Sequence, residues 1–240
     1  IEEVLHEFPS YGQRRTGKAL AANRKRIQRV TRLFGLQAYR RRPKRLRKRR
    51  DESAGAAPYG NLLQAVIPDR PDLAWVSDFT HLRFWERKMY LATVLDACSR
   101  EVVGASVLTG HGAALVLGAF EDALSTGRKP LLLHSDQGSE YRSRTYTRTV
   151  EASGVKVSMS RKRSPWENGM QEAFFSQFKV DLGDPSRFRT LGELVAEVFS
   201  LLHRYNHRRI HSALGMPPAR FAERFRESER LTEVSDERGP

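Results

Sequence analysis

The chain has 240 residues, of which 39% are apolar, which is enough for one sizeable core and a small accessory domain. No run of about 18 apolar residues occurs, so no membrane span and no membrane partner is expected. Cys98 is the only cysteine, which excludes disulfide frameworks and cysteine-based zinc sites and fits a reducing, cytoplasmic setting.

The net charge of +14 is concentrated near the N-terminus. Residues 1–50 hold 17 Lys/Arg and 3 Asp/Glu, whereas the remaining 190 residues hold 25 of each. Such asymmetry indicates an anionic polymer as partner, and nucleic acid leads because each neutralised phosphate releases counterions. An anionic membrane surface is the weaker alternative, since the segment lacks a broad apolar face rich in Trp or Leu.

Residues 1–39 are predicted to be helical. A short helix over 1–8 is followed by helices over about 14–21 and 25–34, with Asn23 as a cap between the last two. Two short helices joined by a tight turn are typical of a helix-turn-helix, although an ordinary helical hairpin gives the same pattern. The candidate DNA contacts on the last helix are Arg24, Lys25, Arg26 and Arg29.

Residues 40–70 are predicted to be a basic arm and linker. Nine of the eleven residues at 40–50 are basic, and 51–70 hold Ala, Gly, Pro and few large apolar groups. A charge run is usually a solvated linker, but directly after a candidate DNA-binding unit it is expected to follow a phosphate backbone. The candidate DNA contacts on the arm are Arg40, Arg41, Arg42, Lys44 and Arg45.

Residues 71–225 are predicted to form the main domain. Three β-rich runs between 74 and 109, with short polar breaks, predict an antiparallel meander. A helix, a buried strand, a helix, another strand and two long helices follow. This order predicts an α/β fold with a mixed five-stranded sheet flanked by helices. Residues 226–240 are polar and charged and are expected to form a disordered tail.

Three carboxylates stand out from their neighbours. Asp78 lies inside a predicted strand, where a carboxylate is costly unless it is paired, lies at an edge or holds a metal. Asp136 directly follows a buried strand, and acids just past strand ends are common at functional crevices of α/β sheets. Glu172 lies on the polar face of a helix with Asn168 and Lys179, for which a solvated helix face is the alternative explanation.

Three carboxylates with few neutralising partners indicate a hard divalent cation. Mg²⁺ or Mn²⁺ prefers oxygen ligands and keeps waters that a phosphate substrate can displace. Two such ions, roughly 3.5–4 Å apart, would activate an attacking oxygen and stabilise a leaving oxygen. The expected substrate is the phosphodiester that the basic arm would deliver.

Five polar or flexible neighbours need a separate explanation. Asp96 also ends a strand but is expected to cap its own turn rather than to bind metal. Glu167 is expected at the start of the Glu172 helix, where negative charge is favoured, and Glu140 is expected to cap the helix that follows the turn. His134 is either structural or orients a carboxylate or phosphate, and Gly138 lets the chain turn tightly after Asp136.

Five stretches of the chain follow one another in a characteristic order: WVSDFT, LDACSR, HSDQGSEY, SRKRSPWENGMQEAFFSQFK and YNHRRIHSALGMPPARF. Together they resemble the insertion-sequence transposases with a retroviral-integrase-like core. Thirty-five residues separate Asp136 from Glu172, which is the spacing of the catalytic acids in that family. The basic N-terminal helices resemble the helix-turn-helix that precedes the core, so the resemblance covers residues 9–222.

The resemblance implies a ribonuclease-H-like fold with a metal-dependent DDE triad of Asp78, Asp136 and Glu172. In such enzymes water frees a 3′-hydroxyl at the element end, and this hydroxyl then attacks a phosphodiester to join DNA strands. The resemblance also implies double-stranded DNA partners, a homo-oligomer in the synaptic complex and a nucleoid-associated location. Many relatives are fused to an upstream DNA-binding frame, which the absence of an initial Met fits, as does truncation.

The chain departs from the family at the start of the third-acid helix. Glu167, Asn168 and Gly169 stand where Asp-Asn-Ala is usual, and glycine costs a helix about 1 kcal/mol relative to Ala. The third carboxylate itself is in place. By resemblance, Lys162 and Arg163 on the preceding loop contact the DNA backbone, with a solvated basic loop as the alternative.

The predicted function is a DNA transposase that cuts and joins phosphodiesters with Mg²⁺ or Mn²⁺. One alternative is a ribonuclease-H-like nuclease that only cuts, which the predicted helix-turn-helix and the YNHRRIHSALG stretch disfavour. The other is a non-catalytic DNA-binding protein derived from a transposase, which the complete triad disfavours.

Overall fold

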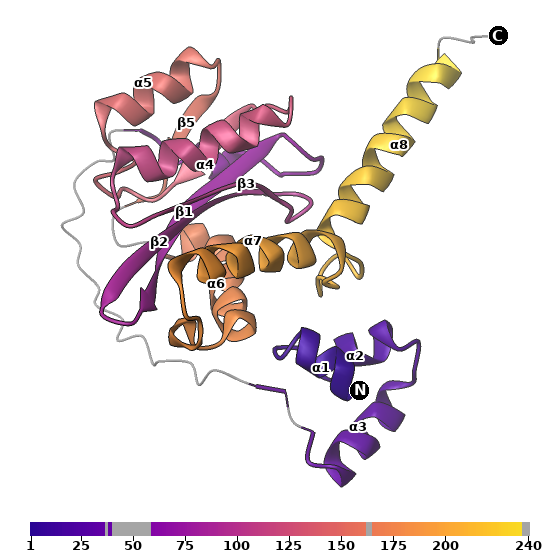
Figure 1. The fold of residues 1–240 in the computed structure, drawn as a ribbon. Coiled ribbons are helices and arrows are strands. Elements are labelled where there is room, and N and C mark those ends of the chain that lie inside the picture. The colour runs from indigo at the N-terminus through magenta and orange to yellow at the C-terminus, as the bar shows by residue number, and fades with distance from the viewer. Residues whose placement is uncertain (37, 40–58, 162–164, 237–240) are drawn as a thin grey trace.

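The computed structural model describes residues 1–36, 38–39, 59–161 and 165–236. Its centre is one five-stranded sheet with the spatial order β3-β2-β1-β4-β5 (Figure 1). The first three strands pair antiparallel, whereas β1–β4 and β4–β5 pair parallel, so the sheet is mixed as predicted. The strands are β1 (Ala74–Phe84), β2 (Arg87–Asp96), β3 (Val102–Leu108), β4 (Leu132–Ser135) and β5 (Lys156–Met159).

The β1–β2 hairpin shows how the sequence pattern sets the sheet. In β1, Leu82 and Phe84 are buried while Arg83 between them is exposed, which is the period-two alternation of a half-buried strand. Phe84 pairs with Arg87, so the turn has only two residues, and Trp85 takes a φ of +51° there. The tight turn fixes the register along the whole hairpin.

Helices cover both faces of the sheet, so the fold has three layers. On one face, α4 (Ala113–Ser125) and α5 (Arg144–Ala152) bury a core that includes Trp75 and Phe120. On the other face, α6 (Gly169–Leu182) and α7 (Leu191–His207) bury a second core around Val76, Phe174 and Leu201. This arrangement satisfies both apolar faces of the central strands, as an α/β sheet requires.

The N-terminal unit consists of α1 (Glu2–Glu7), α2 (Gln13–Ala19) and α3 (Arg24–Leu33). The predicted cap is confirmed, because the side chain of Asn23 accepts a hydrogen bond of 2.8 Å from the backbone N–H of Lys25. A Cβ on Gly17 would lie 2.9 Å from the carbonyl oxygen of Ala22. Glycine therefore allows the close α2–α3 approach that the helix-turn-helix interpretation needs.

Two predicted boundaries differ from the structure. Residues 59–70 are not a free linker, because the short 3₁₀ helix η1 (Leu62–Ala65) docks on the sheet, with Leu62 N–H donating to Ser158 Oγ at 2.9 Å. The tail predicted from residue 226 is also wrong up to Asp236, since α8 (Pro218–Asp236) continues through it and projects away from the sheet (Figure 1). The charged residues of this segment, mostly Arg and Glu, are good helix formers.

Candidate active site

Asp78 lies in the middle of β1, with its side chain half-buried. Strand alternation places it on the same face as Ala74 and Val76, which contact the α6–α7 core. The Asp78 carboxylate accepts a hydrogen bond of 2.8 Å from the N–H of Phe79, and Asp78 stands opposite Thr93 of β2. The carboxylate therefore faces α6, the helix that carries Glu172.

Asp136 lies one residue beyond β4. Val76 pairs with His134 in the parallel β1–β4 register, so Asp78 and Asp136 each lie two residues beyond this pair at neighbouring strands. Asp136 Oδ1 accepts a hydrogen bond of 2.8 Å from Gly138 N–H. A Cβ on Gly138 would lie 3.0 Å from that oxygen, so the glycine keeps the turn around the carboxylate uncrowded.

Glu172 is exposed on the first turn of α6, while its neighbour Gln171 is completely buried. The Gln171 side-chain amide donates to the carbonyl oxygen of Val76 at 2.7 Å and to that of Thr93 at 3.1 Å. Its oxygen accepts from the Thr93 hydroxyl at 3.1 Å. Gln171 thus fixes the start of α6 to both β1 and β2 beside Asp78, a role that sequence reasoning missed.

A sequence signal for Gln171 did exist. It stands three, four and seven residues before Phe174, Phe175 and Phe178, which are all buried. These spacings place it on the apolar stripe of the helix rather than on the polar face. A single amide at the head of an apolar stripe indicates a buried residue with fixed hydrogen-bond partners.

The carboxylates influence one another electrostatically. Burial, reinforced by the charges of Asp136 and Glu172, raises the pKa of Asp78 to about 7 against the lowering effects of the Phe79 N–H and Lys179. Burial also raises the pKa of Asp136, while its hydrogen bond from Gly138 works in the opposite direction. Within the described residues, no three His, Cys, Asp or Glu side chains are gathered closely enough to enclose a metal ion.

The other predicted supporting residues differ in their contacts. Lys179 lies near enough to Asp78 to favour its charged form, in agreement with its place on the polar face of α6. His134 is completely buried and hydrogen-bonds through Nδ1 to Ser158 Oγ at 2.8 Å, which supports its structural interpretation. Asn168 is buried directly before α6, but its side chain does not cap the helix.

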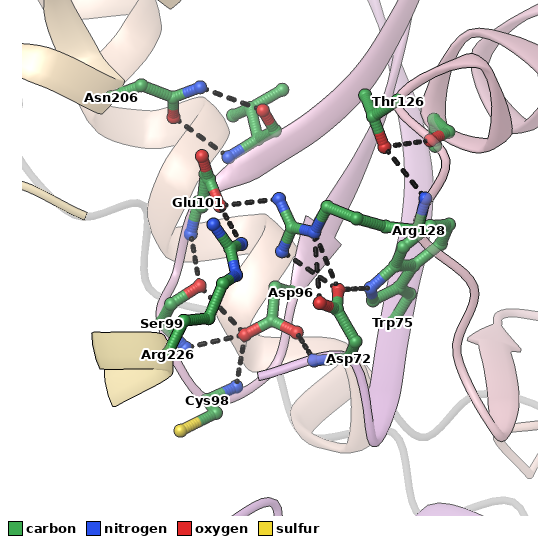
Figure 2. A network of polar contacts seen from close by, with 12 residues as sticks. Asp72, Trp75, Asp96, Cys98, Ser99, Glu101, Thr126, Arg128, Asn206 and Arg226 are labelled. Atoms are coloured by element: carbon green, nitrogen blue, oxygen red, sulfur yellow. Dashed lines mark hydrogen bonds and ion pairs between the residues drawn. The ribbon is translucent and has the colours of Figure 1, made fainter. Parts of the chain in front are cut away.

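Asp96 is a turn-capping residue, as predicted. One carboxylate oxygen accepts from the backbone N–H and the hydroxyl of Ser99 at 2.6 and 2.8 Å, and the other accepts from Asp72 N–H at 2.6 Å. Figure 2 shows that Arg128 joins the same network, contacting Asp72 and Glu101. Both oxygens of Asp96 are thus occupied by protein donors, and Asp96 stands opposite Trp75, whereas Asp78 stands opposite Thr93.

The two neighbouring glutamates bind protein partners. Glu140 does not cap α5, which corrects the prediction: Ser143 is the cap, accepting from Tyr146 N–H at 3.2 Å. Glu140 instead pairs through Oε1 with His111 Nδ1 at 2.6 Å. Glu167 precedes α6 within the 3₁₀ helix η2 (Pro165–Asn168), as expected, and its carboxylate holds Arg161 at 2.8 Å.

The predicted DNA contacts on α3 are all exposed: Arg24, Lys25, Arg26 and Arg29. They form a basic surface on the second helix of the helix-turn-helix-like pair, which is the helix that enters the groove in such motifs. The remaining predicted DNA contacts lie outside the described residues: Arg40, Arg41, Arg42, Lys44, Arg45, Lys162 and Arg163.

Comparisons with known proteins identify the family. Two family models, each described as an integrase core domain, match residues 68–165 and 153–218. The transposase for insertion sequence element IS904 of Lactococcus lactis is 33% identical over 224 residues, which cover 89% of this chain and 88% of the relative. The chain belongs to the insertion-sequence transposases with an integrase core.

Further similarities agree with this family. The putative transposase InsK for insertion sequence element IS150 of Escherichia coli is 34% identical, over 92% of this chain and 81% of the relative. An intasome structure of simian T-cell lymphotropic virus matches with a TM-score of 0.58 over 91% of this transposase and 73% of that chain, at 16% identity. This structural similarity confirms the retroviral-integrase-like, ribonuclease-H-like fold.

For this transposase, the predicted function class is thereby confirmed. Transposase relatives cover about nine-tenths of the chain, which favours DNA transposition over a nuclease that only cuts and over a non-catalytic regulator. Among the residues that the structure describes, no helix is both long and apolar enough to cross a membrane.

Proposed function

We propose that this transposase uses Asp78, Asp136 and Glu172 to bind divalent metal ions and to cut and join DNA phosphodiesters. The observation that carries the proposal is geometric: Asp78 and Asp136 each lie two residues beyond the paired Val76 and His134 of neighbouring strands. Gln171 attaches the helix that carries Glu172 to β1 and β2 beside them. In agreement with this placement, burial and the charges of Asp136 and Glu172 raise the pKa of Asp78 to about 7. Like charges held together at such a cost are typical of functional sites. A divalent cation between the carboxylates would remove that cost.

The chemistry of the three side chains fits a hard cation. Carboxylate oxygens are the ligands that Mg²⁺ and Mn²⁺ prefer, and the exposed Glu172 leaves room for water and phosphate oxygens. We assign two ions to the site, by analogy with other phosphoryl-transfer sites. When bound, they would neutralise phosphate charge and acidify the attacking oxygen.

The protein's own residues have separate parts in the proposed reaction. Gln171 holds α6 at β1 and β2, so Glu172 keeps a fixed position relative to Asp78. Lys179 supplies a positive charge beside Asp78, where it would attract a phosphate oxygen. Gly138 holds Asp136 in its turn through a backbone hydrogen bond. None of these groups forms a covalent bond to DNA in this scheme.

Two phosphoryl transfers make up the proposed reaction. In the first, water attacks the phosphodiester at the element end, one P–O bond forms, another breaks, and a 3′-hydroxyl leaves. In the second, this hydroxyl attacks a target phosphodiester and displaces a second 3′-hydroxyl. Each step exchanges one P–O bond for another, so no other reactant is needed.

The proposed partner is double-stranded DNA, both element end and target. The exposed basic side chains of α3 would hold the end, because each phosphate contact releases counterions. Assembly as a homo-oligomer on paired ends and a nucleoid location are further proposals, which rest on the chain's membership of the transposase family.

A strand-joining assay tests the proposal. A labelled duplex carrying the end of the element that encodes this chain is incubated with Mg²⁺ and wild-type protein, Asp136→Asn, or the exposed control Asp69→Asn. We expect joined products with wild-type and Asp69→Asn, and none with Asp136→Asn. Cleavage without joining would indicate the nuclease, and metal-independent DNA binding without any reaction would indicate the regulator.

A further inference from the structure

Arg209 lies two residues after the end of α7 and is almost completely buried, with 2% of its surface exposed. Its guanidinium pairs with the carboxylate of Asp181 and donates to Gln177 Oε1 at 2.6 Å, both on α6. It also donates to the hydroxyl of Ser10 at 2.7 Å, which belongs to the N-terminal unit. A single buried cation thus joins two core helices to a segment almost 200 residues away.

The N-terminal unit contributes matching groups to the same contact. Ser10 N–H donates to Asp181 Oδ1 at 3.2 Å, and Arg15 donates to Gln177 Oε1 at 3.1 Å. The hydroxyl of Tyr11 accepts a hydrogen bond of 2.5 Å from the backbone N–H of Ile210. We call these residues the Arg209 cluster: Ser10, Tyr11, Arg15, Gln177, Asp181, Arg209 and Ile210.

Aromatic rings pack around the buried centre of the cluster, which is formed by Tyr11 and Arg209. Tyr11 is 1% exposed and stacks on Phe8 with ring centroids 4.7 Å apart. The guanidiniums of Arg209 and Arg15 lie 5.3 and 4.9 Å from the Tyr11 ring. Burial lowers the pKa of Arg15, and it lowers that of the nearby His211 to about 4, so His211 adds no charge at neutral pH. Arg209 and Asp181 neutralise each other on the core side, and the N-terminal unit supplies the Ser10 hydroxyl that accepts from the buried guanidinium.

The core side of the cluster is held firmly by the YNHRRIHSALG stretch. The Asn206 side chain accepts from Val102 N–H at 2.9 Å and donates to the Val102 carbonyl oxygen at 2.8 Å, so the end of α7 is attached to β3. Tyr205 donates its hydroxyl to the carbonyl oxygen of Arg100 at 3.0 Å. Arg209 lies three residues after Asn206, so these anchors fix the backbone that carries its guanidinium.

Asp181 and Gln177 lie on α6, the helix that carries Gln171 and Glu172 near its start. The N-terminal unit therefore docks on the same helix that carries the third carboxylate. We propose that Arg209 is a positioning residue, which holds the N-terminal unit on α6 and α7. DNA bound by α3 then lies at a fixed distance from the three carboxylates of the proposed site. This inference rests on the proposed function, and it assigns to the cluster the choice of the phosphodiester that is cut.

Two variants break the cluster from opposite sides. Arg209→Lys replaces the planar guanidinium, which contacts Asp181, Gln177 and Ser10, by an ammonium group on the core side. Ser10→Ala removes the hydroxyl that accepts from Arg209 on the N-terminal side and leaves the side chains of the core unchanged. Arg204→Lys is the matched control, because the Arg204 side chain contacts Glu197 at 2.6 Å and Ser200, which both lie on α7 with it. If Arg209→Lys does not fold, the measurements on Ser10→Ala alone test the proposal.

Two readouts are taken on each variant. Spin labels at Leu33→Cys on α3 and Glu121→Cys on α4, in a Cys98→Ser background, give the distance distribution between the two units without DNA. A labelled element-end duplex with Mg²⁺ gives the position of the cut. Wild-type and Arg204→Lys are expected to show one narrow distribution and one cut position. Arg209→Lys and Ser10→Ala are expected to show a broader distribution and cuts spread over neighbouring phosphodiesters.

The outcomes separate the two proposals. An unchanged distance distribution in both cluster variants would overturn the docking role of Arg209. A broadened distribution with an unchanged cut position would overturn its positioning role. If wild-type protein cuts no end duplex in Mg²⁺, the proposed function fails, while docking is still decided by the distance distributions.

Discussion

Gln171 and Thr93 form a buried hydrogen bond of 3.1 Å, and Thr93 stands directly opposite Asp78 in the β1–β2 register. The residue before Glu172 is thus fixed to the strand pair that carries Asp78. This contact sets the separation of two proposed metal ligands through protein atoms alone. It makes the geometry of the site dependent on a residue that carries no charge.

Replacing Gln171 tests this dependence. Gln171→Met keeps the side-chain length but loses three hydrogen bonds, so the free energy of unfolding should fall by about 1–3 kcal/mol. Mn²⁺ binding, followed by electron paramagnetic resonance, should weaken as well. Gln13→Met on α2 is the control for both measurements. Unchanged Mn²⁺ affinity in a folded Gln171→Met protein would refute the positioning role.

The raised pKa of Asp78 predicts a pH dependence of stability in the metal-free protein. Because the pKa is raised from 3.8 to about 7 on folding, burial of Asp78 favours its neutral form. The contribution of this pKa shift to the free energy of unfolding is complete below about pH 4 and is lost as the pH rises through about 7. Asp78→Asn should therefore be more stable than wild-type at pH 8, by on the order of a few kcal/mol.

Urea unfolding of both proteins between pH 5 and pH 8 measures this difference. The advantage of Asp78→Asn should grow with pH and level off above the pKa of Asp78. Adding Mg²⁺ at pH 8 should stabilise wild-type and reduce the gap, because a ligand that binds only the folded state stabilises it. A difference that is constant over the pH range would show that Asp78 is not strained by burial and charge.

Asp96 provides the contrast with a carboxylate that we do not assign to the metal. Asp96→Asn should lower the free energy of unfolding by about 1–3 kcal/mol, since its oxygens accept from Asp72 and Ser99. Mn²⁺ affinity should stay at the wild-type value. Loss of Mn²⁺ binding in a folded Asp96→Asn protein would show that Asp96 is a metal ligand and would contradict this assignment.

The corrected cap of α5 can be checked in the same way. Ser143→Ala should lower the free energy of unfolding by about 1 kcal/mol, because Ser143 accepts the hydrogen bond from Tyr146 N–H. Glu140→Gln should leave the start of α5 intact and instead break the ion pair with His111. Hydrogen exchange at the first amides of α5 distinguishes the two. Faster exchange in Glu140→Gln alone would restore the original prediction.

The features that follow from local pattern were predictable. The alternation of apolar and polar residues predicted the antiparallel strands. The apolar run directly before Asp136 predicted that this residue lies just beyond a strand, which is β4. Helical projection separated Glu172 from the phenylalanines of α6. In each case a period of two or 3.6 residues carries the information.

Long-range contacts were not predictable in this way. Gln171 is hydrogen-bonded to Thr93 and Val76, which precede it by 78 and 95 positions. Arg209 is hydrogen-bonded to Ser10, which precedes it by 199 positions. No periodicity relates such partners. The docking of η1 on β5 was missed for the same reason, because Ala, Gly and Pro around it are typical of linkers while its hydrogen bonds come from the sheet.

The central claim is that Asp78, Asp136 and Glu172 together hold the reacting metal ions. Anomalous scattering from crystals of the protein soaked in Mn²⁺ tests it most directly. We predict anomalous peaks within coordination distance of all three carboxylates, and their loss in Asp136→Asn. Mn²⁺ bound elsewhere, or bound with any one of the three carboxylates turned away, would contradict the claim.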